Sequence, residues 1–375
     1  MGTIIKPTRI FSHHRMQAMR QEADPIADEV IEAVYQERGM VGIGQLMTFL
    51  SKKQNQSNYI TPQQPIAKDY AGINMSKTAH EQWVKAAIAT ASLAFTELPG
   101  AELPVSVHNF FASYQQLPAW SNVRQMAEGS IFFQKYTDPL MLLLGLYSLP
   151  YCYAAADGAQ VIYMSQRIHK DTYNRLLETA QFVLEVTKPD AFSANGAGFI
   201  TCNKIRLMHA TIRFYSKQSG RWNDAWGLPI NQDDMASTNL AMSYIPIRGL
   251  RKLNLNPEDK ESEAYLHLWN VVGYLLGVKE ELLPANLREA YHIDRVNVSR
   301  NFRSSDAGIV LTKALLDSLN YFAPESMPKK LPVAQMRLLL GDDVADMLAI
   351  PAADWTWNLV KTTQLRNFFQ SLRIA

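Results

Sequence analysis

The sequence contains very little cysteine. Its 375 residues include only two cysteines, Cys152 and Cys202, and neither belongs to a C-x-x-C pair. This composition excludes a disulfide framework and a metal site made of paired cysteines. It also excludes the C-x-x-C-H motif that attaches haem covalently, so any haem in this protein is expected to be bound non-covalently.

Neither sign of charge dominates the chain. There are 37 Lys and Arg residues against 35 Asp and Glu residues, which gives a formal net charge of +2 at pH 7. The basic residues form pairs such as Lys52-Lys53 and no dense run. Nucleic-acid binding proteins concentrate positive charge, so no nucleic-acid partner is expected.

Long hydrophobic runs are also missing. The most apolar stretch, residues 140–149, is too short to span a bilayer and is followed by Pro150. The first 20 residues contain no apolar segment of the kind found in a signal peptide. We therefore expect a cytoplasmic protein with no integral membrane segment, and the 47% hydrophobic content predicts a sizeable core.

Several common catalytic motifs are absent as well. The sequence has no G-x-S-x-G and no H-E-x-x-H. Gly42-Ile43-Gly44 lacks the third glycine and the strand context of a dinucleotide fingerprint, and adjacent His13 and His14 diverge on a helix. These patterns give no support for a hydrolase, a zinc protease or a Rossmann dehydrogenase.

Helical periodicity dominates what is present, so the predicted fold class is all-α. The expected helices cover residues 24–39, 40–50, 78–97, 104–114, 118–129, 138–147, 151–169, 171–188, 198–215, 231–244, 256–276, 279–290, 307–322, 332–337 and 340–347. Asp171 is expected to cap its helix. The chain is predicted to form a single domain, with a core at about 80–280 and helical additions at 1–75 and 280–375.

The most informative motif is Arg206-x-x-His209-x-x-x-Arg213. Spacings of three and four residues place all three side chains on one face of an α-helix. Ile205, Met208, Ile212 and Tyr215 form a separate apolar stripe on the same helix. Neutral imidazole is a good ligand for iron, and arginine pairs well with carboxylates such as haem propionates.

Three further segments accompany this motif in order along the chain. They are residues 175–180 (RLLETA), residues 226–234 (WGLPINQDD) and residues 269–278 (WNVVGYLLGV). Together with the His209 motif they resemble the haem-dependent oxygenase family of latex-clearing rubber oxygenases and the mycophenolic acid pathway oxygenase. The resemblance implies a globin-like helical core with extra helices, and haem b held between a proximal and a distal helix. It implies His209 as the proximal iron ligand, with Arg206 and Arg213 as haem-side anchors.

The same resemblance assigns the distal side to the segment from Arg175 to Thr179. Family members have an R-x-x-K-T segment whose Arg and Thr line the distal pocket and whose Lys can ligate iron. This sequence keeps Arg175 and Thr179 but has Glu178 at the lysine position. Glu178 either lines the pocket with them or forms a solvated helix pair with Arg175.

A distal carboxylate base is part of the activity in rubber oxygenases. The position that aligns with it is Ala159 in this sequence, and Asp157 is the nearest acid. Asp157 is therefore either a substitute base or an ordinary helix or turn residue.

The leading hypothesis is a haem b oxygenase that acts with O₂ on a hydrophobic, isoprenoid-like or otherwise unsaturated small molecule. One alternative is a non-catalytic haem or hydrophobic-ligand binding protein. Another is a peroxidase-like haem enzyme that uses Glu178 as its distal acid or base. Residues 226–234 are interpreted as structural, with a Gly-x-Pro turn followed by a helix capped by Asn231 or Asp233.

Overall fold

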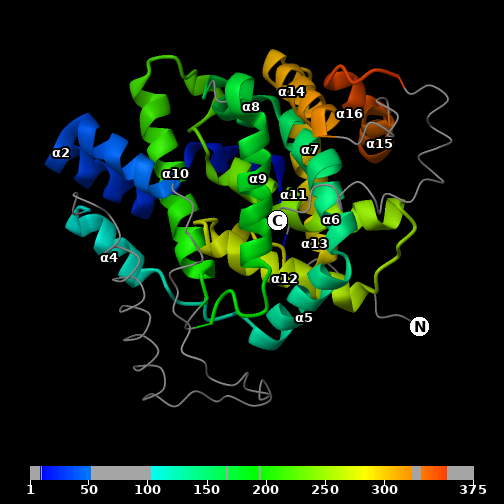
Figure 1. Ribbon diagram of the computed structural model, residues 1–375, viewed down its shortest axis with the longest axis horizontal. Coiled ribbons are helices and arrows are strands. Elements are labelled where there is room, and N and C mark those ends of the chain that lie inside the picture. The colour runs from blue at the N-terminus through cyan, green and yellow to red at the C-terminus, as the bar shows by residue number, and fades with distance from the viewer. Residues whose placement is uncertain are drawn as a thin grey trace.

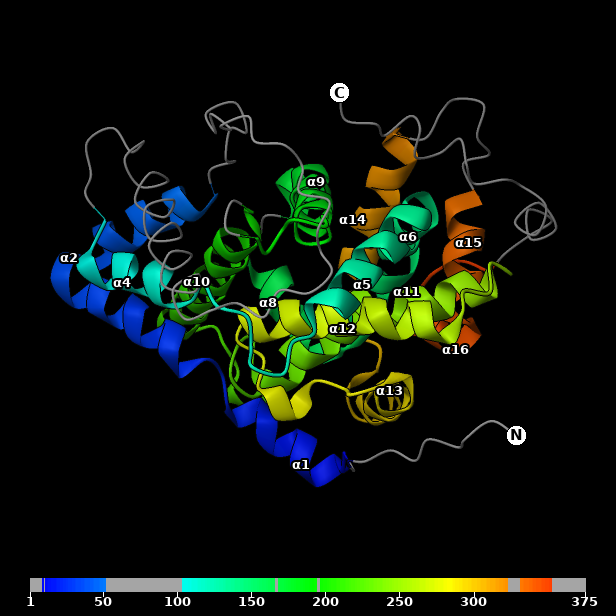
Figure 2. The same cartoon turned by 90° about the horizontal axis from the view of Figure 1, so that it is seen from below.

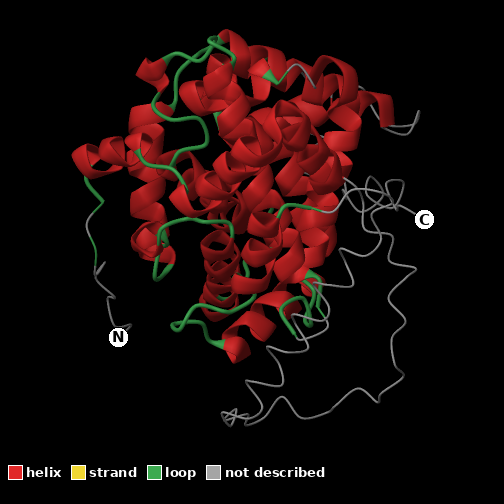
Figure 3. Cartoon of the chain, turned by 90° about the vertical axis from the view of Figure 1, so that its left-hand side faces the viewer, coloured by secondary structure: helices red, strands yellow, loops and turns green. Residues whose placement is uncertain are grey.

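A computed structural model of the chain describes residue 9 and residues 11–51, 103–165, 168–193, 196–322 and 331–352. The α-helices are α1 (His13–Ala18), α2 (Pro25–Ser51), α4 (Val105–Ser113), α5 (Val123–Lys135), α6 (Thr137–Leu143), α7 (Leu149–Ala154), α8 (Ala156–Met164), α9 (Ile168–Val186), α10 (Gly198–Gln218), α11 (Gln232–Lys252), α12 (Asp259–Leu275), α13 (Leu287–Asn301), α14 (Asp306–Phe322), α15 (Leu331–Leu340) and α16 (Asp342–Met347). One π-helical turn, η3 (Leu144–Ser148), follows α6, and three short 3₁₀ turns, η1 (Met19–Gln21), η4 (Asp224–Trp226) and η5 (Glu280–Leu282), lie in connecting segments. The described residues contain no strand, which confirms the all-helical fold class (Figure 3).

Helices α11 and α12 form the centre of the core. About two thirds of the residues in each helix are buried, and Trp269 of α12 is only 1% exposed. Helix α5 packs along α12, while α13 packs against α11 (Figure 2). The buried cluster around them extends from Phe11 near the N-terminus to Ile350, so the helices after residue 280 share the same core.

Helix α10, which contains the His209 motif, lies between two other helices. It contacts α9 on one side and α2 on the other, and it also meets α12 (Figure 1). A second, smaller core cluster fills the space between α2, α4 and α10 and includes Ile31, Phe111 and Leu207. This packing fixes the side of α10 that faces α2.

The helix boundaries follow local capping chemistry. Asn122, Asn231 and Asn286 each accept a hydrogen bond from a backbone N–H in the first turn of α5, α11 and α13. Helix α12 begins with a capping box formed by Glu258 and Glu261. Asn231 is thus the cap of α11, and the alternative assignment of the cap to Asp233 was wrong.

Most predicted helices are confirmed, with informative exceptions. Residues 25–51 do form two helical parts, because Gly39 has non-helical dihedral angles at their junction (φ 61°, ψ −157°). The predicted helix over 151–169 is broken at Ala155 (ψ 89°) into the separate helices α7 and α8. Asp171 does not cap α9, since that helix already begins at Ile168. The predicted helix over 78–97 lies outside the described residues.

Charged side chains attach the N-terminal segment to the core. Arg9 donates from Nη2 to the buried carboxylate of Glu289 on α13 at 2.7 Å. Arg20 donates from Nη2 to the carbonyl oxygen of Trp226 at 2.5 Å, and the N–H of Leu228 donates to the Arg20 carbonyl at 2.8 Å. The segment from Arg9 to Asp24 is therefore part of the folded core.

This segment approaches the backbone closely at Gly227. This residue has φ +80°, and a Cβ placed there would lie 2.6 Å from the backbone oxygen of Arg20. Glycine is required at such a position both for the left-handed backbone and for the close contact. Gly220 has a similar φ of +64° but nothing within 4 Å of the added Cβ, so it is a matched control.

We expect Gly220→Ala to cost about 1–2 kcal/mol of stability, because a left-handed backbone is unfavourable for alanine. Gly227→Ala should cost about 2 kcal/mol more, since a backbone oxygen cannot move away as a side chain can. Urea unfolding of the two variants measures the difference. Equal losses for the two variants would mean that the contact with Arg20 does not constrain the loop.

Candidate functional site

His209 lies in the middle of α10 and is half-buried. Its Nδ1 atom is buried and has no hydrogen-bond partner. Neither ring nitrogen makes a hydrogen bond within the part of the chain that the structure describes. Burial, together with the nearby positive charge of Arg213, lowers the pKa of His209 to about 4. The imidazole is therefore neutral near pH 7, which is the protonation state that ligates a metal.

Arg206, one turn before His209, is paired with the carboxylate of Asp24, which directly precedes α2. Its Nε donates to Oδ2 of Asp24 at 2.5 Å and its Nη2 donates to Oδ1 at 2.8 Å. Both side chains are nearly fully buried, with exposures of 8% and 4%. The guanidinium also lies 4.9 Å from the centre of the Tyr114 ring, which is a favourable cation–π geometry.

Arg213, one turn after His209, has an equivalent partner. Its Nε donates to Oδ1 of Asp28 at 2.8 Å, and its Nη1 donates to the carbonyl oxygen of Ile230 at 3.1 Å. Its Nη2 is buried without a partner. Burial raises the pKa of Asp28, and the charge of Arg213 opposes that rise.

The two predicted haem-side anchors therefore already have protein partners. Asp24, directly before α2, and Asp28, in its first turn, are four residues apart, and they hold two arginines that are seven apart on α10. A role for Arg206 and Arg213 at haem propionates stays a prediction, whereas their contacts in the structure join α10 to α2. Sequence reasoning missed both aspartates, because Asp24 before Pro25 was interpreted only as the start of a helix.

The predicted distal residues lie on α9, the neighbouring helix. Arg175 has its Nη1 atom buried without a partner, as His209 has its Nδ1. Thr179 is half-buried and donates its hydroxyl hydrogen to the Arg175 carbonyl oxygen at 2.9 Å. Arg175 also acts electrostatically on Tyr153, where burial raises the pKa to about 12 and the arginine opposes the rise.

Glu178 differs from these two residues because its side chain is exposed. Its exposure favours the solvated alternative over a place in the pocket beside Arg175 and Thr179. Within this segment, burial and the missing hydrogen-bond partner single out Arg175.

Asp157 lies elsewhere, in a cluster of charged side chains. It accepts a hydrogen bond from Arg303 and lies 3.9 Å from Nη2 of Arg20. Ala159, at the position expected for the base, is 1% exposed. The contacts of Asp157 are therefore those of a structural ion pair, and they do not include the predicted site residues on α9 and α10.

The same cluster explains the segment at residues 226–234. Asp233 is fully buried and accepts hydrogen bonds from Arg20, Arg300 and Asn301. Asp234 accepts from Arg20 at 2.9 Å, and burial raises its pKa to about 6. This segment is a structural junction between the N-terminal residues, α11 and α13, as its interpretation from sequence proposed.

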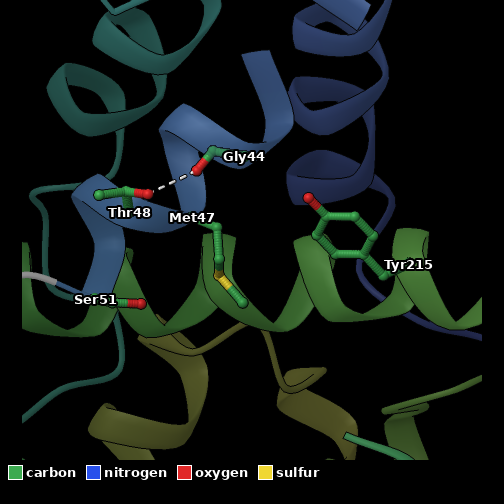
Figure 4. A pocket seen from close by; sticks show the side chains of 5 residues that line it. All are labelled: Gly44, Met47, Thr48, Ser51 and Tyr215. Carbon is green, nitrogen blue, oxygen red and sulfur yellow. Dashed lines mark hydrogen bonds between the residues drawn. The ribbon is translucent and has the colours of Figure 1, made fainter. Parts of the chain in front are cut away.

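Two pockets lie along the interface of α2 and α10. One, of about 450 Å³, is lined by Gly44, Met47, Thr48, Ser51 and Tyr215 (Figure 4). The other, of about 430 Å³, is lined by ten residues that include Asp28, Glu32, Arg213 and Phe214. Neither pocket is lined by His209, Arg175 or Thr179, so neither one is the predicted ligand site.

The described residues contain no group of three or more His, Cys, Asp or Glu side chains that could hold a metal ion. No helix among them is both long and apolar enough to cross a membrane. A cofactor bound through a single imidazole needs no such cluster, and His209 is the residue with the required protonation state and no hydrogen-bond partner.

The described residues form an all-helical protein. On α10, the neutral imidazole of His209 has a buried nitrogen without a hydrogen-bond partner. The neighbouring helix α9 carries Arg175, which also has a buried nitrogen without a partner. Residues 135–374 match the family described as the catalytic domain of the ER-bound oxygenase mpaB/B' and rubber oxygenase, so this chain belongs to that family of oxygenases.

Two relatives show how far the likeness extends. The chain is 26% identical over 256 residues to the rubber oxygenase of Streptomyces sp. (strain K30), and this covers 68% of the chain and 62% of that protein. The match thus spans less than two thirds of the relative's length. The solved structure of latex clearing protein LCP in the closed state superposes with a TM-score of 0.68 at 21% identity, over 95% of this chain and 85% of that one. This likeness confirms the helical fold.

The raised pKa of Asp234 gives a testable pH dependence. A carboxyl whose folded pKa lies near 6, above its ordinary value of 3.8, holds a proton in the folded state that the unfolded chain releases. This group therefore contributes stability below about pH 4, and that contribution is lost as the pH rises through about 6. The full contribution is at most about 3 kcal/mol.

Asp234→Asn should remove this component, so the stability difference between wild type and variant should change between pH 4 and pH 7. Urea unfolding at several pH values measures it, with Asp259→Asn at an 87% exposed side chain as the control. Parallel pH profiles for wild type and Asp234→Asn would contradict the assignment.

Proposed function

We propose that this protein is a haem b-dependent oxygenase that acts with O₂ on a hydrophobic, unsaturated small molecule. The observation that carries the proposal is His209, whose neutral imidazole has a buried Nδ1 without a hydrogen-bond partner in a chain that belongs to an oxygenase family. A buried polar atom without a partner is costly, and a ligand that occupies it offsets the cost. Iron can satisfy an imidazole nitrogen in this way, because neutral imidazole is a good ligand for it.

The residues present fit a haem held between α9 and α10. His209 on α10 would hold the iron, and Arg175 on α9 would offer a buried hydrogen-bond donor. The bound haem would supply the activation of O₂, which amino-acid side chains alone do not provide. Because neither cysteine belongs to a C-x-x-C-H motif, the haem is proposed to be bound non-covalently.

The side chains of α9 have distinct proposed roles. Arg175 offers a buried nitrogen without a partner, which would stabilise negative charge that develops on the α9 side of the site. The hydroxyl of Thr179 donates its hydrogen to the Arg175 carbonyl, so its oxygen remains an acceptor that orients the Arg175 side chain or the substrate. Leu176 and Phe182 on the same helix are partly buried and pack against the apolar core.

The substrate class is proposed from the relatives. A relative is named as a rubber oxygenase, and rubber is an unsaturated hydrocarbon polymer. We propose a hydrophobic, unsaturated small molecule as the substrate of this protein. O₂ is the co-substrate.

The contacts of Asp157 favour a second candidate, a non-catalytic haem or hydrophobic-ligand binding protein. The nearest acid to the expected base position is engaged by Arg303, and Ala159 has no acid–base group. Product analysis under O₂ with polyisoprene oligomers, squalene and carotenoids separates the two candidates. Oxidised cleavage products support the oxygenase, and intact haem without turnover supports the binding protein.

The central prediction compares His209→Ala with Thr179→Ala. His209→Ala should abolish stoichiometric haem binding or displace the Soret band, because the axial nitrogen is lost. Thr179→Ala should keep the haem and its spectrum but lose most of the activity, since it changes only the distal side. Absorption spectra and O₂ consumption measure both effects, and unchanged spectra in His209→Ala would remove the axial assignment.

A further inference from the structure

We propose that Asp24 is a positioning residue for His209, which acts through Arg206. It fixes the orientation of α10 and cancels the positive charge beside the imidazole, and it thereby lowers the reduction potential of iron bound there. This inference rests on the proposed function, because it concerns haem iron on His209. Neither the family nor the motif around His209 points to Asp24, which lies 182 positions before Arg206 in the chain.

The first argument is the geometry of the pair. Both oxygens of Asp24 accept a hydrogen bond from Arg206, at 2.5 and 2.8 Å, so the two planar groups are aligned in two parallel bonds. A bidentate pair restricts rotation as well as distance. Since Arg206 lies three residues before His209, the pair fixes the rotation of α10 and so the direction in which the face with His209 points.

The second argument is that Asp24 is itself held in place. Gln232 donates to the carbonyl oxygens of Ala23 and Gly277, at 2.7 and 2.9 Å, and accepts from the backbone of Lys279. Gly277 leaves room for the ion pair, because a Cβ there would lie 2.3 Å from Oδ2 of Asp24. Gln232 at the start of α11 and Gly277 after the end of α12 therefore fix the position of the Asp24 carboxylate.

The third argument is electrostatic. The paired charges of Asp24 and Arg206 lie one helical turn from His209. With exposures of 4% and 8%, Asp24 and Arg206 are poorly screened by water. Removal of the Asp24 charge would leave Arg206 as an uncompensated buried cation one helical turn from the imidazole.

The consequence for a bound iron has a definite sign. Reduction of ferric to ferrous iron adds one electron, so the oxidised state is the more positive one. An uncompensated cation nearby destabilises the more positive state and makes reduction easier. The wild-type Asp24 carboxylate cancels this effect and keeps the potential lower.

Asp28 offers an internal comparison. It makes a single side-chain hydrogen bond to Arg213, and its side chain is 33% exposed in the second pocket. Solvent screens such a pair more strongly. The effect of Asp28 should have the same sign as that of Asp24 and a smaller size.

The test is a spectroelectrochemical titration of the full-length protein loaded with haem, with dithionite as reductant. Asp24→Asn should shift the midpoint potential to a more positive value than wild type. Asp259→Asn, the same chemical change at an exposed ion pair, should leave it unchanged. The double variant Asp24→Asn with Arg206→Gln removes both charges and should return the potential toward the wild-type value.

The outcomes are distinct. A restored potential in the double variant supports the charge effect, because a merely structural defect would persist or worsen. An unshifted potential in Asp24→Asn with normal haem content would overturn the inference but leave the proposed function intact. If Asp24→Asn does not fold, Asp28→Asn replaces it, and no positive shift there would also overturn the inference. A wild-type protein that binds no haem would remove the proposed function and the inference together.

Discussion

The buried ion pair between Asp24 and Arg206 is the interaction on which the candidate site depends. Two charges taken out of water carry a desolvation cost of several kcal/mol each, and their attraction offsets it only when the geometry is good. The two parallel hydrogen bonds and the nearby Tyr114 ring meet that condition. Loss of one partner from such a pair typically costs about 3–5 kcal/mol, because the other charge remains buried.

The same principle recurs along the N-terminal segment. Arg9 meets Glu289, Arg20 meets the carboxylates of Asp233 and Asp234, and Asp28 meets Arg213. Charges of both signs on one short segment thus join four helices of the core, namely α10, α11, α13 and the start of α2. On one side of α10, the helix that carries His209, two arginines pair with Asp24 and Asp28. The helix also packs against α9 and α12. Because α10 is held in this way, the Nδ1 atom of His209 can remain buried without a hydrogen-bond partner.

The sequence predicted the fold class and most helices because both depend on local patterns. Helical periodicity found α4, α10 and α14 nearly at their true ends, and it found both parts of α2 on either side of Gly39. It failed at Ala155, where the chain breaks between α7 and α8 without a proline or glycine at that residue. The break accompanies an isolated bridge between Ala155 and Phe302, a contact between residues far apart in the sequence that periodicity does not encode.

The candidate site shows the same division. The spacing of Arg206, His209 and Arg213 predicted a shared helix face, and the structure places all three on α10. The partners of the two arginines could not be predicted, because Asp24 and Asp28 are separated from them by more than 180 residues. Gly277 belongs to a recognisable sequence segment, but its role beside Asp24 becomes visible only when α12 and the N-terminal segment are brought together.

The most direct test of the central claim is a hemin titration of the purified apoprotein, followed by a pyridine haemochrome assay. Our account predicts a saturating Soret band with one haem b per chain and a spectrum typical of imidazole ligation. A protein that stays colourless after reconstitution, or that binds hemin without saturation, would contradict the assignment of His209 as an iron ligand.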